Sequence, residues 1–368
     1  MSDKPLLFII NYHKGELNVV YTYISILKHV DYPVKVIYLT RNGRHLYPHG
    51  DLLMNSLSIN YLNFGKLATE VDITDLDEYL EELQPIGASV DVGSPEWLAQ
   101  YFDQQKIPLY HHLHAFTTYP WSNKYLAIPQ ASPSKLLVAK VILHETTSIK
   151  RFRWLGYAST AVTGWTCMHS TVLNKTLKNK KLQEKKYVII YSYEFRSDFF
   201  PLEDWLFAHK VVIEVASMLN LSVCIRSHPS QGNNQLVALK QVTDIQIDDI
   251  SNDNVFDASA YNGIHCGIMT SGPVLAHLRG MPACAIYPVR KGCHRPEHCI
   301  IPGLPVDIFT ELGMKSLSYY ENINHYNIKR LLLESVDNAG KNYMMSSVEL
   351  DTSLEHNLAR AYEISSHD

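Results

Sequence analysis

The chain has 368 residues and a formal net charge of −4, with its lysines and arginines spread rather than gathered in blocks. Duplex nucleic acid requires a basic patch or stripe, so nucleic acid is not expected as a partner. The length gives room for two domains of about 150 to 200 residues, each large enough to bury a core of its own.

Neither a membrane span nor a secretion signal is expected from the sequence pattern. No apolar run approaches the roughly 18 residues that a membrane span needs, and residues 1–18 lack a basic stretch followed by an uninterrupted apolar core. Six cysteines are scattered through the chain, which suits buried thiols in a reducing compartment better than a disulfide framework. Both observations favour a cytoplasmic protein.

The first half of the chain alternates short apolar runs with segments of helical apolar spacing. Alternation of this kind predicts a parallel sheet covered by helices on both faces. The expected strands are 6–12, 34–40, 58–64, 88–93 and 108–116, and the expected helices are 16–30, 75–83 and 95–105.

The end of this half is harder to divide. Residues 134–157 are apolar and basic at helical spacing and are expected to form a long helix, and 160–165 predict one more strand. The polar, lysine-rich segment 174–186 has no apolar stripe to bury. We therefore expect a first domain over 1–173 and a linker over 174–186.

The strand and helix pattern restarts after the linker. Strands are expected at 187–195, 222–228, 244–248, 267–271 and 283–288, with helices at 203–219, 326–336 and 354–365. This indicates a second doubly wound domain over 187–340, followed by a C-terminal helical segment over 341–368.

The most informative stretch is 263–288, which predicts a strand, a Ser/Gly turn, an apolar helix closed by Gly280, and another strand. The turn holds Thr270, Ser271 and Gly272, whose hydroxyls and backbone N–H groups could hold a phosphate at the positive end of the helix dipole. An ordinary helix N-cap is the alternative interpretation of the two hydroxyls, and it is compatible with phosphate binding. A nucleotide-activated donor is the expected ligand.

This region resembles the C-terminal half of GT-B glycosyltransferases, in particular the capsule or teichoic-acid-type polymer transferases. The residues that carry the resemblance are His228-Pro229 after a strand, the Thr270-Ser271 turn, and Ala276 through Pro282. It implies an α/β fold of two Rossmann-like doubly wound domains that face each other across a cleft, with ligands at the carboxyl ends of the strands. It also implies that the C-terminal helix packs back on the first domain.

The same resemblance implies donor contacts. The turn at 270–272 would contact the donor phosphate, and Asp257 would lie where a base or ribose contact is often found. Because Pro229 ends the strand, His228 is expected at the mouth of the cleft, where its ring could stabilise the charge of a departing phosphate. A surface histidine that caps a turn is the alternative.

Two arginines complete the expected donor site. Arg226 precedes His228 by two residues and shares a strand face with it, so either a phosphate contact or a buried ion pair would fit. Arg196 lies in a segment similar to the P-T-F-R-D loop of teichoic-acid-type polymerases, although the Pro-Thr is absent. Its guanidinium could clamp an anionic group bidentately, and a solvated loop arginine is the equal alternative.

The loop after the first strand supplies candidates for the general base. An inverting sugar transfer needs a base near the acceptor hydroxyl, and His13 or Glu16 could provide it, with Lys14 beside them. A plain polar turn is the alternative.

His112 and His114 share one face at the end of another strand, at the same edge of the sheet. We expect them to bind the acceptor or to take part in base catalysis. No metal is expected, because no carboxylate or cysteine lies at ligand spacing from them.

One further resemblance concerns residues 144–152, which are similar to the H-G-T-x-x-K motif of glycerol-phosphate polymerases. Glu145 replaces the glycine, and the segment falls inside the long helix expected over 134–157. In such a helix His144 could not take the family's base role, which makes a polyol-phosphate transferase less favoured.

The sequence thus predicts a metal-independent glycosyltransferase without a cofactor, which moves a sugar from a nucleotide-activated donor to an oligosaccharide or lipid-linked acceptor during synthesis of a bacterial surface polysaccharide. The alternatives are a CDP-glycerol or ribitol-type polyol-phosphate transferase, a transferase for a CMP-linked acidic sugar, a nucleotide-sugar epimerase or hydrolase, and a non-catalytic carbohydrate-binding subunit. An epimerase would require carboxylates deep in the cleft, and the sequence shows no convincing pair. Residues 150–157 could support peripheral contact with the inner membrane or pack between the domains.

Overall fold

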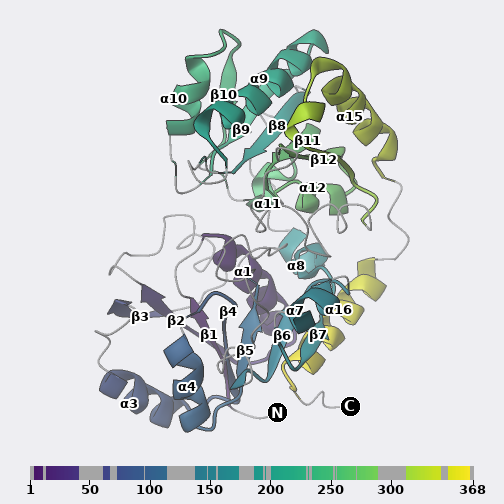
Figure 1. The fold of residues 1–368 in the computed structure, drawn as a ribbon. Coiled ribbons are helices and arrows are strands. Elements are labelled where there is room, and N and C mark those ends of the chain that lie inside the picture. Colours follow the sequence, from purple (N-terminus) through teal and green to yellow (C-terminus); the bar gives the residue numbers. More distant parts are fainter. Residues whose placement is uncertain are drawn as a thin grey trace. The chain divides into compact units, whose positions relative to one another are not determined.

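The computed structural model describes residues 4–10, 14–40, 61–66, 73–94, 96–113, 137–146, 148–154, 156–173, 186–193, 195, 200–228, 231, 234–251, 253, 255–270, 272–288, 312–340 and 347–364. These residues form two compact units, each built on one parallel sheet (Figure 1). The first unit takes in the described residues of 4–113, 137–173 and 347–364, and the second those of 186–288 and 312–340.

The sheet of the first unit has the strand order β3-β2-β1-β4-β5-β6-β7, and every neighbouring pair is parallel. All residues of β1, β4 and β5 are buried, as expected when helices cover both faces of a parallel sheet. The strands are β1 Leu6–Ile10, β2 Val34–Thr40, β3 Tyr61–Lys66, β4 Gly87–Asp91, β5 Leu109–His112, β6 Lys140–Leu143 and β7 Thr160–Val162.

Helices cover the two faces of this sheet in separate groups. Leu7 and Ile9 join a core formed with α3 (Ile73–Leu83), α4 (Glu96–Gln104) and α7 (Ser148–Trp154). The intervening Phe8 contacts Tyr23 of α1 (Lys14–His29) and Tyr362. Successive strand residues point to opposite faces, so α1 covers the other side. There α1 contacts η1 (Thr166–Met168), α8 (Ser170–Leu173) and α16 (Ser347–Ala361).

The long helix expected over 134–157 is wrong. Residues 140–143 form β6 between β5 and β7, and the helix α7 that follows covers 148–154. Val141, Ile142 and Leu143 are fully buried within the sheet. A short apolar run in a buried parallel strand has no period that separates it from a helix, and this caused the error.

The second sheet has the order β10-β9-β8-β11-β12-β13, again entirely parallel. Its strands are β8 Tyr187–Ser192, β9 Ser222–Arg226, β10 Ile247–Asp249, β11 Gly263–Ile268, β12 Ala283–Tyr287 and β13 Lys315–Ser318. Its helices are α9 Leu202–Met218, α10 Asn234–Lys240, α11 Val255–Ala258, α12 Val274–Leu278, η3 Tyr320–Asn322 and α15 His325–Asn338. The fold class of two doubly wound α/β domains is therefore confirmed.

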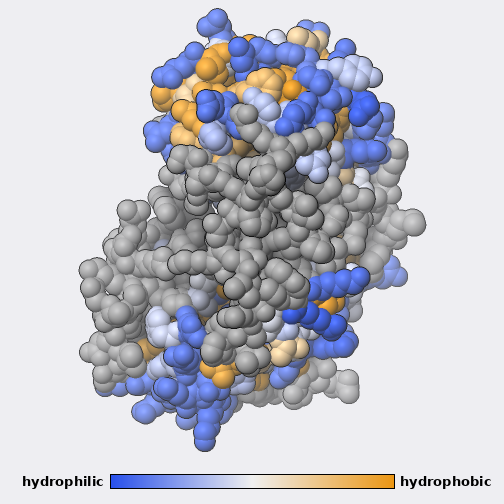
Figure 2. Space-filling model, viewed as in Figure 1, coloured by the Kyte–Doolittle hydropathy of each residue, from blue (hydrophilic) through white to orange (hydrophobic). Residues whose placement is uncertain are grey.

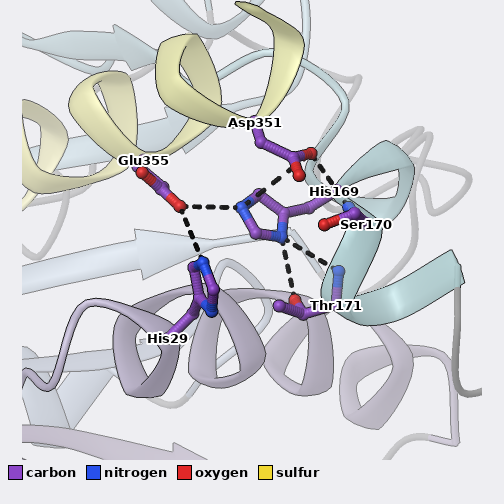
Figure 3. Close-up of polar contacts among 6 residues, drawn as sticks. All are labelled: His29, His169, Ser170, Thr171, Asp351 and Glu355. Carbon is purple, nitrogen blue, oxygen red and sulfur yellow. Dashed lines mark hydrogen bonds and ion pairs between the residues drawn. The ribbon is translucent and has the colours of Figure 1, made fainter. Parts of the chain in front are cut away.

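Polar contacts fasten α16, drawn in yellow in Figure 1, to the first unit (Figure 3). The backbone N–H of Thr171 donates to Nδ1 of His169 at 3.2 Å, so the ring proton of the neutral imidazole lies on Nε2. That nitrogen donates to Oε1 of Glu355 at 3.1 Å, and the Ser170 N–H donates to Oδ1 of Asp351 at 2.9 Å. Both acidic residues belong to α16, so this helix is held by the side chain of His169 and the backbone N–H of Ser170, at the start of α8.

The surface drawn in Figure 2 mixes hydrophilic and hydrophobic residues over the second unit. Val237 of α10 is 55% exposed and Leu333 of α15 is 46% exposed. Among the described helices, none is both long and apolar enough to cross a membrane. Phe152, which belongs to the segment expected to touch the membrane or to pack, is buried in the core of the first unit.

Candidate functional site

The carboxyl edge of the second sheet has a switch point between β8 and β11. These strands are neighbours, whereas β9, which follows β8 along the chain, lies on the other side of β8. In open α/β sheets, ligands bind in the crevice at such a point. Tyr193 follows β8 and donates its N–H to the carbonyl of Ile268, the last residue of β11, at 3.2 Å. The loop after β8 and the Thr270 turn therefore start side by side.

His228 lies at this same edge, two residues beyond β9. Its backbone N–H donates to Oε1 of Gln235 at 2.7 Å, and Nε2 of Gln235 donates to the carbonyl of Tyr193 at 2.6 Å. The His228 ring stands edge-on to the Tyr193 ring, with 5.1 Å between centroids. Gln235 is fully buried and ties the two loops together, which leaves the partly exposed His228 ring in a fixed place.

The turn after β11 packs closely on the sheet. Met269 has a φ of 56°, and the Gly272 N–H donates to the hydroxyl of Thr270 at 3.2 Å. A Cβ on Gly272 would lie 2.5 Å from Cδ1 of Tyr191, so only glycine fits there without a shift. The N-cap residue of α12 is Pro273, which makes no side-chain capping hydrogen bond. Thr270 therefore does not cap the helix, contrary to the alternative interpretation of this turn.

Arg226 is held by a neighbouring loop. Its Nε donates to the carbonyl of Asp253 at 3.2 Å, and Tyr261 donates its hydroxyl to the Asp253 carboxylate. Burial lowers the pKa of Arg226, and the nearby Asp253 opposes that shift. This contact is to a backbone carbonyl and not to a carboxylate, so both interpretations of Arg226, a phosphate contact and a buried ion pair, stay predictions. Asp257 lies in α11, and its base or ribose contact also stays a prediction.

Several predicted site residues lie outside the part of the chain that the structure describes. They are His13, His114, Arg196 and Ser271, together with the side chain of Lys14, which opens α1. Their roles remain predictions.

At the carboxyl edge of the first sheet, the structure brings together two candidates that are 96 residues apart. Nε2 of His112 lies 3.3 Å from Oε1 of Glu16, and Nδ1 lies 2.9 Å from the hydroxyl of Ser89. Burial lowers the pKa of His112 to about 4, and the nearby Asp91 opposes that shift. His112 is therefore neutral at pH 7. Both of its ring nitrogens are engaged inside the protein, so in this state neither faces an acceptor.

Asp91 is a site candidate that the sequence analysis missed. It ends β4 directly beside His112 of β5, is 3% exposed, and accepts the Gly93 N–H on Oδ1 at 2.5 Å. Glu16 and Asp91 thus place two buried carboxylates around one neutral imidazole, where the sequence showed no convincing pair. The available signal was an aspartate at the carboxyl end of an apolar strand.

His144 also reaches this edge, because it directly follows β6. Its ring stacks on Trp165 with 5.5 Å between centroids, Nδ1 lies 3.4 Å from the carbonyl of Gly164, and burial lowers its pKa to about 4. Glu145 accepts the N–H of Ser148 at the start of α7. His144 therefore lies between the strand β6 and the helix α7 and not inside a long helix, which removes the reason for setting it aside.

Within the described residues, no group of three or more His, Cys, Asp or Glu side chains could hold a metal ion. The two edges offer neutral imidazoles, hydroxyls, backbone N–H groups and buried carboxylates. Such groups can bind an anionic ligand and move protons.

Comparison with known proteins gives a match only at the level of the fold. No protein-family model matches the chain, and a search of curated proteins found no significant match. Among solved structures, the UDP-GlcNAc 2-epimerase of Methanocaldococcus jannaschii in complex with UDP-GlcNAc and UDP is 15% identical with a TM-score of 0.61, over 95% of this chain and 98% of that one.

Two further solved structures show the same similarity. The UDP-GlcNAc 2-epimerase of Neisseria meningitidis bound to UDP-GlcNAc is 15% identical with a TM-score of 0.59, covering 98% of both chains. Phytolacca americana UGT2 complexed with UDP-2fluoro-glucose and pterostilbene is 11% identical with a TM-score of 0.55, over 97% of this chain and 94% of that one. The chain therefore has the GT-B-like α/β fold that these epimerases and glycosyltransferases share.

Proposed function

We propose that this protein is an enzyme of nucleotide-sugar metabolism, and specifically a glycosyltransferase that moves a sugar from a nucleotide-activated donor to a carbohydrate acceptor. The observation that carries the proposal is the carboxyl edge of the second sheet, where Tyr193, His228 and the 270–272 turn meet at a switch point. The three solved proteins described above share this fold and are 11 to 15% identical to this chain in sequence. Their structures hold UDP or UDP-sugars. They support a nucleotide donor for this chain.

The leaving nucleotide carries the charge that develops during sugar transfer. His228, held by Gln235 and Tyr193, and Thr270 supply hydrogen-bond donors at one edge, and Arg196, Arg226 and Ser271 are the further donor contacts of this proposal. Preorganised donors of this kind stabilise a departing diphosphate without a metal ion. Asp257 would contact the nucleoside.

The first unit would supply the base and the acceptor site. Glu16 is a buried carboxylate in the first turn of α1, and His112 lies within hydrogen-bond distance of it. It or His13 would take the proton of the acceptor hydroxyl. Lys14, His112 and His114 would line the acceptor side. A lipid-linked acceptor for a surface polysaccharide of the capsule or teichoic-acid type would bring the protein to the cytoplasmic face of the inner membrane.

A second candidate function is a nucleotide-sugar 2-epimerase. It is favoured by the buried carboxylates Glu16 and Asp91 around the neutral His112, since inversion at a sugar carbon needs groups that remove and return a proton. Two of the solved proteins described above are UDP-GlcNAc 2-epimerases.

A third candidate, the polyol-phosphate transferase, regains support from the place of His144 after β6. A neutral imidazole at a strand end is suited to accept the proton of a polyol hydroxyl. This reaction would release CMP from a CDP-linked donor.

Product analysis separates these candidates. The protein is incubated with UDP-GlcNAc, UDP-glucose, GDP-mannose, CDP-glycerol and a CMP-linked acidic sugar, each with and without an oligosaccharide primer, and the products are followed by NMR and mass spectrometry. Primer-dependent release of the nucleotide with an extended primer supports the glycosyltransferase. A C2 epimer formed without primer supports the epimerase, and CMP released from CDP-glycerol supports the polyol-phosphate transferase. If the protein binds carbohydrate but forms no product, the enzymatic proposal fails and a non-catalytic binding subunit takes its place.

A further inference from the structure

The C-terminal helix reaches the buried polar groups of the first unit through one side chain. Tyr362 follows α16 directly, is fully buried, and packs edge-on against Phe8, Tyr23 and Tyr110 with centroid distances of 5.8, 6.2 and 5.1 Å. Its hydroxyl lies 2.9 Å from the hydroxyl of Ser89 on β4. The ring of Tyr362 is thus packed among aromatic side chains, and its hydroxyl oxygen lies beside Ser89 of the sheet.

Four buried side chains form one continuous chain of hydrogen bonds from this atom. The Tyr362 hydroxyl contacts Ser89, the Ser89 hydroxyl contacts Nδ1 of His112 at 2.9 Å, and Nε2 of His112 contacts Oε1 of Glu16 at 3.3 Å. All four residues are fully buried. Glu16 on α1 and Tyr362 at the end of α16 are thereby connected through β4 and β5.

The protonation states of these groups decide which side chain donates in each of the hydrogen bonds. Burial raises the pKa of Tyr362 well above its usual value and lowers that of His112 to about 4, so the phenol keeps its proton and the imidazole is neutral. With Glu16 as the ionised base of the proposed function, its carboxylate only accepts, so Nε2 of His112 donates to Glu16 and Nδ1 accepts from Ser89. Ser89 then accepts the proton of Tyr362. Each member has a partner with one consistent order of protons.

We propose that Tyr362 is a positioning residue that acts through Ser89 to hold His112 in its Nε2–H tautomer, and thereby holds the Glu16 carboxylate in place. The tautomer follows from the contacts when the Glu16 carboxylate is the acceptor. The consequence for the reaction rests on the proposed function, in which Glu16 is a general base.

Docking of α16 does not require this hydroxyl. The helix is already attached through Glu355 and Asp351 to His169 and Ser170 (Figure 3). It also buries Leu358 completely. Burying a polar group costs free energy unless it is fully hydrogen-bonded, and a phenylalanine would fill the same pocket without that requirement. The hydroxyl of Tyr362 is therefore not needed to attach α16, and its role lies in its hydrogen bond to Ser89.

The charged and titratable groups that face His112 come from three elements. Glu16 faces it from α1, Asp91 from β4, and Tyr362 from the end of α16, while the ring of Phe8 on β1 lies 6.3 Å away. Protonation of His112 would place an N–H against the Ser89 hydroxyl and reverse the order of protons. The network is therefore expected to keep one tautomer from pH 8 down to about pH 5.

The test uses the full chain labelled with ¹⁵N-histidine. The hydrogen-bonded network of Tyr362, Ser89, His112 and Glu16 is called the relay here. Tyr362→Phe removes only the hydroxyl at its start, and Ser89→Ala is a second variant that interrupts the same network. Tyr110→Phe is the matched control, because its buried hydroxyl donates to the Tyr362 carbonyl at 3.3 Å and lies outside the relay. The measurements are the ¹⁵N shifts of His112, thermal stability, and the pH dependence of kcat with the donor that gives product.

In the wild type and in Tyr110→Phe, we expect the Nε2–H tautomer. In Tyr362→Phe and Ser89→Ala, we expect a mixture of tautomers and a fall in kcat of about five-fold, the size that one buried hydrogen bond predicts, with a displaced acid limb of the pH profile. A wild-type Nδ1–H tautomer, or an unchanged His112 in both relay variants, overturns the inference. If no donor gives product, the proposed function fails, and the NMR result still decides the relay.

Discussion

The imidazole of His228 stands edge-on to the phenol ring of Tyr193, although the two residues follow different strands. The strands β9 and β8 are parallel neighbours, so both residues leave the sheet at the same edge, and Gln235 bonds to the backbone of each. The His228 side chain is therefore oriented before a ligand arrives, which reduces the conformational entropy lost on binding.

Gly272→Ala is expected to disturb the turn after β11. The new Cβ would fall 2.5 Å from Cδ1 of Tyr191, which is fully buried and cannot move away freely. Overpacking of this kind costs about 1 to 3 kcal/mol. Thermal unfolding should show a melting temperature lower by several degrees, with weaker nucleotide binding. A variant as stable as the wild type would show that the turn is not packed as described.

Acidification is expected to destabilise the fold between pH 6.5 and about pH 4. Burial lowers the pKa of four histidines to about 3 or 4, namely His112, His144, His209 and His265. In that window the unfolded chain binds protons that the folded chain does not, so stability is complete above pH 6.5 and is lost as pH falls. The measurement is the melting temperature from pH 8 to pH 4.5.

His209→Gln should flatten this pH dependence, because it removes one buried imidazole that bonds to Trp205 and Ser192. His325→Gln is the matched control, since His325 lies on the surface of α15 and pairs with Glu214. Equal pH dependence in His209→Gln and the wild type would contradict the account.

Leu358→Ala tests the attachment of α16 to the first unit. Leu358 is fully buried, and removal of such a side chain costs about 2 to 5 kcal/mol. Leu333→Ala on α15 is the control, because that leucine is 46% exposed and its loss should cost about 0.5 kcal/mol or less. Chemical denaturation of both variants gives the comparison, and similar losses would argue against a docked α16.

The sequence predicted most strands, because each is a short apolar run bounded by polar or glycine-containing segments. Two strands were missed for different reasons. The residues of β6 lie in a continuously apolar stretch that also fits a helix, and β13 is a short edge strand, partly exposed, with little apolar pattern.

The candidate site was predictable only in part. His228 and Thr270 stand at strand ends and could be found from their positions, whereas Gln235 and Ser89 act through partners from other elements. No spacing in the chain relates Glu16 to His112 or to Tyr362. Pairing of strands and docking of α16 create those contacts, so they became visible only in the structure.

Chelation of metal ions should leave activity unchanged. The proposal assigns neutralisation of the leaving phosphate to His228, Thr270 and neighbouring donors. Product formation is measured before and after EDTA treatment, and again after addition of magnesium. Loss of product with EDTA and its return with magnesium would contradict this part of the proposal.

The central claim, that the carboxyl edge of the second sheet holds a nucleotide, is tested most directly by thermal shift with UDP, GDP, dTDP, CDP and CMP. A ligand that binds only the folded state raises the melting temperature by mass action. We predict a clear shift with one nucleotide and a loss of affinity of about ten-fold or more in His228→Ala, as for a hydrogen bond to a charged group, with His325→Ala unaffected. No shift with any nucleotide, or an equal shift in His228→Ala, would contradict the claim.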